Sequence, residues 1–174
     1  EGGNGVADVL TGRVNPCGKL TDTIARDISD YPADQNFGDP KKNYYKEDIY
    51  VGYRYFETLA SDRVLYPFGY GLSYTEFQTE AMFEFDFQDE IRVRVCVKNI
   101  GKRPGKEVTQ IYIRLPQGRL GKPARVLAGF YKTPELQPGE SIDVMVSCKK
   151  IYFASFDDLG EAGHPGCMLL EAGR

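Results

Sequence analysis

Residues 91–98 decide the fold class, and they read IRVRVCVK, with an aliphatic side chain at every second position. The aliphatic residues from Ile91 to Val97 would share one face of an extended strand, because successive side chains of a strand point to opposite faces. Two arginines, a cysteine and a lysine fill the other face. This period of two predicts a strand that packs one face against a core and exposes the other.

Further segments on both sides of this strand carry the same kind of pattern. Turn sequences such as Pro138-Gly139 separate them. Short alternating strands in succession indicate a mainly β protein, built as an immunoglobulin-like or fibronectin-like sandwich. The other expected strands lie around Phe83–Phe87 and over 108–115, 125–132 and 141–148, with Ile142, Val144 and Val146 directed inward.

The first residues of the chain carry a helical pattern instead. Val6, Val9 and Leu10 recur at helical spacing. Asn4 is a candidate N-cap, and Gly12 can adopt the left-handed conformation that ends a helix.

Residues 30–75 show few regular signals but many aromatic rings. Eight of the twelve tyrosines lie between Tyr44 and Tyr74. A solvated linker would be rich in Ser, Pro, Glu and Lys instead. We therefore expect an ordered strap that is pressed against a surface, with its rings buried and its hydroxyls on polar partners.

Composition and charge argue against several classes of function. The net charge is −3, and basic residues alternate with acidic ones, so nucleic acid is not an expected partner. No apolar run approaches the ~20 residues that a membrane-spanning helix needs. The four cysteines lack C-x-x-C spacing, so we expect no metal site, no cofactor and free thiols. Free thiols favour a reducing compartment, and we expect the cytoplasm.

Other catalytic chemistries find little support in the sequence. His164 is the one histidine, and it lies beside a proline in a turn-like stretch, where we expect it to be solvated. Asp86 and Asp157-Asp158 lack the spacing of a calcium-binding loop.

Several strings, in register along nearly the whole chain, resemble glycoside hydrolase family 3. GGNGVADVL at 2–10 and NPCGKL at 15–20 are similar to the end of the family's α/β-sandwich domain, although Cys17 stands where serine is common. YKEDIYVGYRYF at 45–56 and YPFGYGLSYT at 66–75 resemble the passage into the family's fibronectin type III-like domain. The strings that match strands and turns of that domain are VKNIG at 97–101, GKEVTQIY at 105–112 and LQPGE at 136–140.

The resemblance implies three parts. Residues 1–29 would carry the last helix and strand of the α/β-sandwich domain, residues 30–75 the interdomain strap, and residues 76–174 the fibronectin type III-like sandwich. The family's domain continues with one more alternating strand. We therefore expect this sandwich to lack its last strand, and both ends of the chain to be cuts through folded elements.

The resemblance also implies a parent enzyme, a retaining β-glycosidase of the β-glucosidase kind that hydrolyses terminal β-D-glucosyl residues in carbohydrate metabolism. That reaction needs two carboxyl groups about 5 Å apart. In the family the nucleophilic aspartate lies in a separate barrel domain, and the acid/base glutamate lies upstream of the helix at 2–10. Ser29-Asp30-Tyr31 is interpreted as a turn and Glu1 as a charge at a helix start. We expect no catalytic residue in this chain and no activity from the chain alone.

Tyr53, Arg54 and Tyr55 are the candidate binding residues. Aromatic faces can stack on sugar rings, but packing between domains is the favoured interpretation. Arg54 could pair with a carboxylate of a neighbouring domain or stack on a ring. The expected partners are the barrel and α/β domains of the parent and, in the parent, a β-linked glucoside or oligosaccharide.

Two hypotheses from different classes remain open. In the first, the chain is the non-catalytic carboxyl-terminal part of the glycosidase and stabilises its catalytic domains. In the second, it is an independent fibronectin-like carbohydrate-binding or adhesion module. Residues 1–20 favour the first, because an independent module has no need of the last helix and turn of an α/β domain.

Overall fold

The computed structural model describes residues 1–85, 90–115, 117, 121–149, 154–156, 162–163 and 169–173. Helices are labelled α, short 3-10 turns η and strands β. In chain order the elements are α1 (Gly2–Leu10), β1 (Ile24–Ala25), η1 (Ile28–Asp30), η2 (Asp34–Asn36), α2 (Tyr53–Leu59), η3 (Ser61–Arg63), β2 (Val64–Tyr66), β3 (Phe77–Phe85), β4 (Glu90–Asn99), β5 (Val108–Arg114), β6 (Val126–Lys132), β7 (Ser141–Lys149), β8 (Ser155–Phe156), β9 (Ala162–Gly163) and β10 (Leu169–Gly173).

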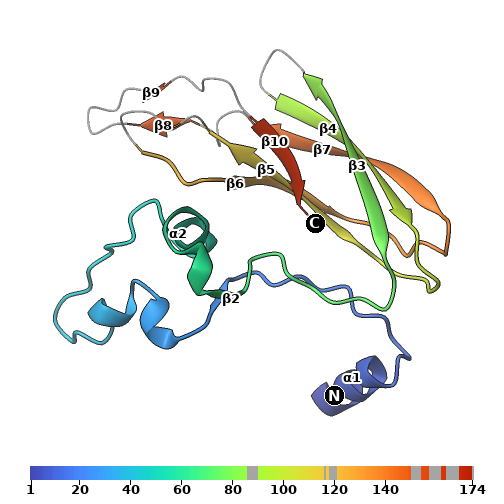
Figure 1. Ribbon diagram of the computed structural model, residues 1–174, viewed down its shortest axis with the longest axis horizontal. Coiled ribbons are helices and arrows are strands. Elements are labelled where there is room, and N and C mark those ends of the chain that lie inside the picture. Colours follow the sequence, from blue (N-terminus) through green and yellow to red (C-terminus); the bar gives the residue numbers. More distant parts are fainter. Residues whose placement is uncertain are drawn as a thin grey trace.

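Two three-stranded antiparallel sheets form the main body of the molecule (Figure 1). Their strand orders are β3-β4-β7 and β10-β5-β6. The mainly β, fibronectin-like sandwich that the alternation predicts is therefore confirmed. Among the predicted strands, β3 differs in its start: it begins at Phe77, well before the aromatic alternation that predicted it.

The core between the two sheets follows directly from the period of two. In β4 the side chains of Val93, Val95 and Val97 are fully buried, and Arg92, Arg94 and Lys98 on the opposite face are exposed. Burying each valine contributes about 1.5–3 kcal/mol relative to leaving it exposed. The buried core residues are Ile91, Val93, Val95, Val97, Ile111, Ile113, Leu136, Val144, Val146 and Cys148.

The described cysteines occupy the faces that alternation assigns to them. Cys148 is buried in the core, whereas Cys96 is half-buried on the outer face, and both are free thiols, as is Cys17. Burial raises the pKa of the Cys148 thiol, and burial together with the neighbouring Asp143 raises that of Cys96. Both thiols are therefore held in their less reactive, protonated form.

The strap forms a further layer against the sandwich, and it contains a helix that the sequence did not predict. The expectation that the strap's rings are buried is wrong for five of the eight tyrosines, which are exposed: Tyr44, Tyr45, Tyr66, Tyr70 and Tyr74. Figure 1 shows α2 beneath β6, with the rest of the strap running below the sheets. The strap residues Phe56 and Ala60 form a small second core together with Ala25 of β1, which precedes the strap; we call it the strap core. Tyr112 of β5 is only 1% exposed although it alternates with the inward residues Ile111 and Ile113, because the strap covers that outer face.

Helix α1 differs from its prediction at its start and agrees at its end. Asn4 lies inside the helix, so its assignment as the N-cap is wrong; Glu1 occupies that position and makes no capping hydrogen bond through its side chain. The helix starts earlier than predicted because Gly2 and Gly3 already adopt helical conformation. Gly12 has φ +71, which confirms it as the left-handed residue after the helix.

Near the end of the chain, β10 pairs with β5 and forms one edge of its sheet. The further strand that the family resemblance implies after it stays a prediction. The expectations for His164, Asp86, Asp157, Asp158 and Cys167 fall outside the described residues.

Candidate functional site

Tyr53, the first of the three candidate residues, packs against the sandwich from the start of α2. Its ring stacks on Phe68 with centroids 4.5 Å apart and meets the Tyr112 ring edge-on at 6.3 Å. The Leu127 backbone N–H donates a hydrogen bond of 2.8 Å to the Tyr53 hydroxyl oxygen. Tyr53 thus joins α2 to both β5 and β6, with its ring packed and its hydroxyl paired.

Arg54 and Tyr55 make different contacts. The Arg54 guanidinium carbon lies 6.0 Å from the Tyr53 ring centroid. Tyr55 packs edge-on against Phe56 at 5.2 Å, beside the strap core. The structure therefore brings one candidate onto the sandwich and keeps another within the strap. A sugar-binding role for any of the three stays a prediction.

An ion pair lies one turn further along α2. The Arg125 guanidinium donates two hydrogen bonds to the Glu57 carboxylate, and these side chains are 28% and 16% exposed. The guanidinium carbon also lies 4.4 Å from the Tyr112 ring centroid. A bidentate, half-buried pair fixes geometry as well as attracting its partners. The two residues are 68 positions apart, so no local sequence pattern could have indicated the pair.

These residues form one connected surface, which we call the strap contact. Beside the ion pair, the Ala124 N–H donates to the Thr58 hydroxyl oxygen at 2.9 Å, and that hydroxyl donates to the Arg54 carbonyl oxygen at 2.6 Å. Aromatic, charged and backbone groups all take part in the contact. Its members are Tyr53, Glu57, Thr58 and Phe68 on the strap, with Tyr112, Ala124, Arg125 and Leu127 on the sandwich.

Tyr112 at the centre of the strap contact has a perturbed acidity. Burial raises the pKa of its hydroxyl to about 12, and the nearby Arg125 partly opposes this effect. The hydroxyl donates a hydrogen bond of 2.8 Å to Gln110 Oε1. An unfolded tyrosine ionises near pH 10. The stability that Tyr112 contributes as a neutral group is therefore fully present below pH 10 and is lost as the pH rises to 12.

Replacing Tyr112 by phenylalanine tests this pH dependence. At pH 8 we expect Tyr112→Phe to be less stable by about 1 kcal/mol, because the hydrogen bond to Gln110 is lost. Between pH 10 and 12 the original chain should lose about 2–3 kcal/mol more than the variant. Urea denaturation at a series of pH values measures both quantities, and parallel stability curves would contradict the assignment.

A second contact joins the end of the strap to the sandwich through Asn99, which is fully buried. Its Oδ1 accepts hydrogen bonds from the Thr75 hydroxyl at 2.7 Å and the Gly101 N–H at 3.1 Å. Its Nδ2 donates to the carbonyl oxygens of Arg103 and Leu136 at 2.8 and 2.9 Å. The sequence indicated only a turn here and missed the amide that joins the end of the strap, the turn after β4 and the segment at Leu136.

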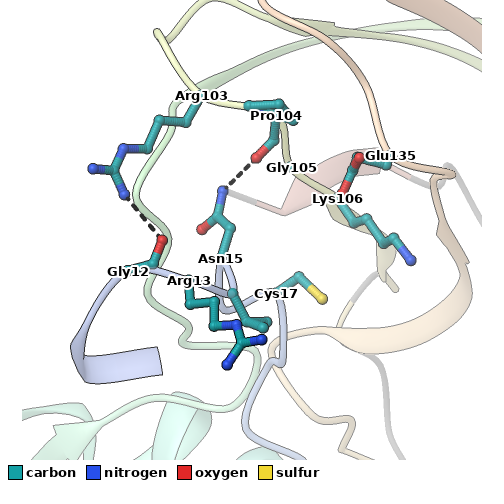
Figure 2. Close-up of a pocket in the computed structure, with 10 residues that line it drawn as sticks. Gly12, Arg13, Asn15, Cys17, Arg103, Pro104, Gly105, Lys106 and Glu135 are labelled. Atoms are coloured by element: carbon teal, nitrogen blue, oxygen red, sulfur yellow. Dashed lines mark hydrogen bonds between the residues drawn. The ribbon is translucent and has the colours of Figure 1, made fainter. Parts of the chain in front are cut away.

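A hollow of about 560 Å³ lies where residues 12–17 meet the sandwich turn 103–106. Figure 2 shows the Asn15 amide directed toward the Pro104 carbonyl oxygen, to which Nδ2 donates at 2.8 Å. Among the residues that line the hollow, the side chain of Glu135 supplies the one carboxylate. Two carboxyl groups are needed to cleave a glycosidic bond, so this hollow is unsuited to that reaction.

The remaining expectations about sites concern short segments. Ser29-Asp30-Tyr31 is confirmed as a turn: Asp27 caps η1, and Asp30 Oδ2 accepts from the Asp27 N–H at 3.2 Å. Within the described ranges, no group of three or more His, Cys, Asp or Glu side chains could hold a metal ion. In the same part of the chain, no helix has the length and apolar character needed to cross a bilayer.

Two family models match the chain. Residues 1–74 match the glycosyl hydrolase family 3 C-terminal domain, and residues 107–165 match the fibronectin type III-like domain. The first match includes α2, and the second includes β5 and β6, so the strap contact joins the two matched regions.

Individual proteins agree with the family models. A β-glucosidase of Ruminococcus albus is 51% identical over 172 residues, and β-glucosidase A of Butyrivibrio fibrisolvens is 48% identical over 191 residues; each alignment covers 99% of this chain. The solved β-glucosidase of Paenibacillus barengoltzii is 48% identical with a TM-score of 0.92, and covers 99% of this chain. The chain spans 18%, 23% and 20% of the length of these three proteins.

Proposed function

The chain belongs to glycosyl hydrolase family 3, and on this premise we propose that it is a non-catalytic part of a retaining β-glycosidase that removes terminal β-D-glucosyl residues. Its role in that enzyme is to stabilise the catalytic domains. The observation that carries this proposal is the 51% identity to a β-glucosidase along nearly the whole chain. The strap contact supports the structural role, because it ties the family's C-terminal domain to the sandwich by a half-buried ion pair.

The proposal assigns the chemistry to residues outside this chain. By the family resemblance, the nucleophile and the acid/base belong to parts of the parent outside this chain, and the resemblance leaves the order of the domains open. The partners of the chain are then those domains, and the substrate of the parent is a β-linked glucoside or oligosaccharide. The free thiols Cys17, Cys96 and Cys148 support a reducing compartment for the parent.

Fragment complementation tests both parts of the proposal. The chain alone should not hydrolyse a chromogenic aryl β-glucoside. The Ruminococcus albus relative, produced without the segment that matches this chain, should bind the chain and inactivate at a higher temperature when it is present. Hydrolysis by the purified chain would contradict the non-catalytic role. Binding of oligosaccharides by the chain alone, with no effect on the truncated relative, would favour an independent binding module.

A further inference from the structure

Helix α1 has little that would hold it in place by itself. Three of its nine residues are glycines, each of which costs about 1 kcal/mol relative to alanine in a helix interior. None of its residues is buried, and no side chain caps its first turn. An isolated helix of this length is not stable in water even with better helix formers. Its order and its direction must therefore come from contacts with other segments.

The contacts that the structure gives α1 are concentrated at its carboxyl end. The Tyr74 hydroxyl donates a hydrogen bond of 2.8 Å to the Val9 carbonyl oxygen. The Arg103 guanidinium donates a long hydrogen bond of 3.5 Å to the Gly12 carbonyl oxygen (Figure 2). The guanidinium carbon lies 5.5 Å from the Tyr74 ring centroid. A cation at this end is favoured, since the last carbonyl groups carry the negative end of the helix dipole.

Asn15 fixes the position of the strap residues next to this contact, Ser73 and Tyr74. Its Oδ1 accepts hydrogen bonds from the Tyr74 N–H at 2.8 Å and the Ser73 hydroxyl at 3.0 Å. Its Nδ2 donates to Pro104, the residue after Arg103 in the sandwich turn. The Asn15 side-chain amide therefore forms hydrogen bonds with both the end of the strap and the sandwich turn. From there, Tyr74 and Arg103 both reach the last turn of α1.

Gly12 leaves room for the arginine. A Cβ atom at Gly12 would lie 2.9 Å from Arg103 Nη1, and the φ of +71 already favours glycine. The last turn is closed beside it by the N–H groups of Arg13 and Val14, which both donate to the Asp8 carbonyl oxygen at 2.9 and 3.0 Å. The helix end is thus shaped to receive a planar cation.

We propose that Tyr74 and Arg103 are positioning residues that fix the direction of α1 relative to the sandwich. Tyr74 binds the Val9 carbonyl group from the end of the strap, and Arg103 binds the Gly12 carbonyl group, just after the helix, from the sandwich turn. The inference goes beyond the proposed function, since it concerns how the sandwich orients the preceding domain and requires no hydrolysis. Both side chains are exposed, so their main effect is on the motion of α1, and the sandwich core is left unchanged. Arginine suits the role better than lysine because its planar group can stack on Tyr74 while it donates to Gly12.

A tryptophan on α1 provides a direct reporter, because the chain contains no other tryptophan. Val6 is 60% exposed in the middle of the helix, so Val6→Trp should be tolerated. In the otherwise unchanged chain we expect the fluorescence anisotropy of Trp to decay mainly with overall tumbling. In the double variant Arg103→Ala, Tyr74→Phe we expect the amplitude of that slow decay to fall by about half, as nanosecond motion of α1 appears.

Hydrogen exchange on the chain without the reporter gives the second readout. Protection of the Arg13 and Val14 amides should fall about tenfold in the double variant, and protection of Val93 and Val95 in β4 should not change. In Arg103→Lys the protection of these two amides should lie between that of the original chain and that of the double variant, because lysine keeps the charge and loses the stacking. Lys102→Ala, at an exposed neighbouring position, is the matched control and should have no effect.

Two results would overturn the proposal. If α1 keeps its slow anisotropy decay and its amide protection in the double variant, other contacts hold the helix. If β4 loses protection together with α1, the two residues maintain the fold and do not position α1 separately. Neither result would bear on the proposed function, which rests on complementation of the truncated relative.

Discussion

Phe56→Ala is expected to lower the free energy of unfolding by about 3–5 kcal/mol, which is the usual cost of deleting a buried aromatic ring. Phe56 is 1% exposed and is the one aromatic ring among the buried residues of the strap core, Ala25, Phe56 and Ala60. Its ring meets Tyr31 edge-on at 5.4 Å and Tyr55 at 5.2 Å. Removing it would leave a cavity that these rings can fill only in part. Urea denaturation followed by tyrosine fluorescence measures the loss.

The matched control for Phe56→Ala lies on the same helix. Leu59 is 62% exposed, so Leu59→Ala should change stability by no more than about 0.5 kcal/mol. Equal effects of the two substitutions would show that the strap does not pack as the structure describes. Of the aromatic rings in α2, we expect Phe56 to contribute most to the free energy of unfolding. The aromatic pattern of the sequence had instead singled out Tyr53 and Tyr55, which are half-buried.

Asn99→Ala should also lower the free energy of unfolding by about 3–5 kcal/mol, for a different reason. It removes four hydrogen bonds at once and leaves the Thr75 hydroxyl, the Gly101 N–H and two carbonyl groups to find other partners. Each buried polar group that stays unpaired costs about 1–3 kcal/mol. Thermal denaturation followed by circular dichroism would measure the effect as a lowered Tm.

Two further variants identify the source of that loss. Ile100 is 51% exposed, so Ile100→Ala next to Asn99 should leave Tm nearly unchanged. Thr75→Val removes one of the four hydrogen bonds and leaves an Asn99 oxygen that still accepts from Gly101, so we expect about a quarter to a half of the effect of Asn99→Ala. A stability of Asn99→Ala within 1 kcal/mol of the original chain would contradict this account.

The part of the fold that could be predicted from the sequence is the part with a local period. Residues 91–98 alternate so strictly that strand, face and core position follow from the sequence alone. Helix α2 has no such signal: its sequence YRYFETL begins with aromatic residues that favour strands, and it buries one residue, Phe56. Tertiary contact overrides local preference there, because Glu57, Thr58 and Tyr53 all bind the sandwich.

In the candidate site, too, some residues could be predicted from the sequence and others could not. Tyr53 could be singled out because aromatic residues cluster around it. Its partner Tyr112 could not, since alternation alone would expose it; only the strap over that face accounts for its burial. The roles of Asn99 and Arg103 depend on segments that lie far from them in sequence, such as Thr75 and Gly12. No pattern within one strand or turn encodes such pairs.

The strap contact has a consequence for recombination between relatives. The two family models leave residues 75–106 between their matches, and a crossover there would seem the natural place to exchange sandwiches. A hybrid made by such a crossover would take Glu57 from one parent and Arg125 from the other. The surroundings of its Tyr112 would be mismatched in the same way. A crossover placed before β1 would keep Glu57 with its own Arg125, and Phe56 with its own Ala25. Hybrids of the second kind should therefore be recovered as stable proteins more often, and the unit that is inherited intact begins before β1.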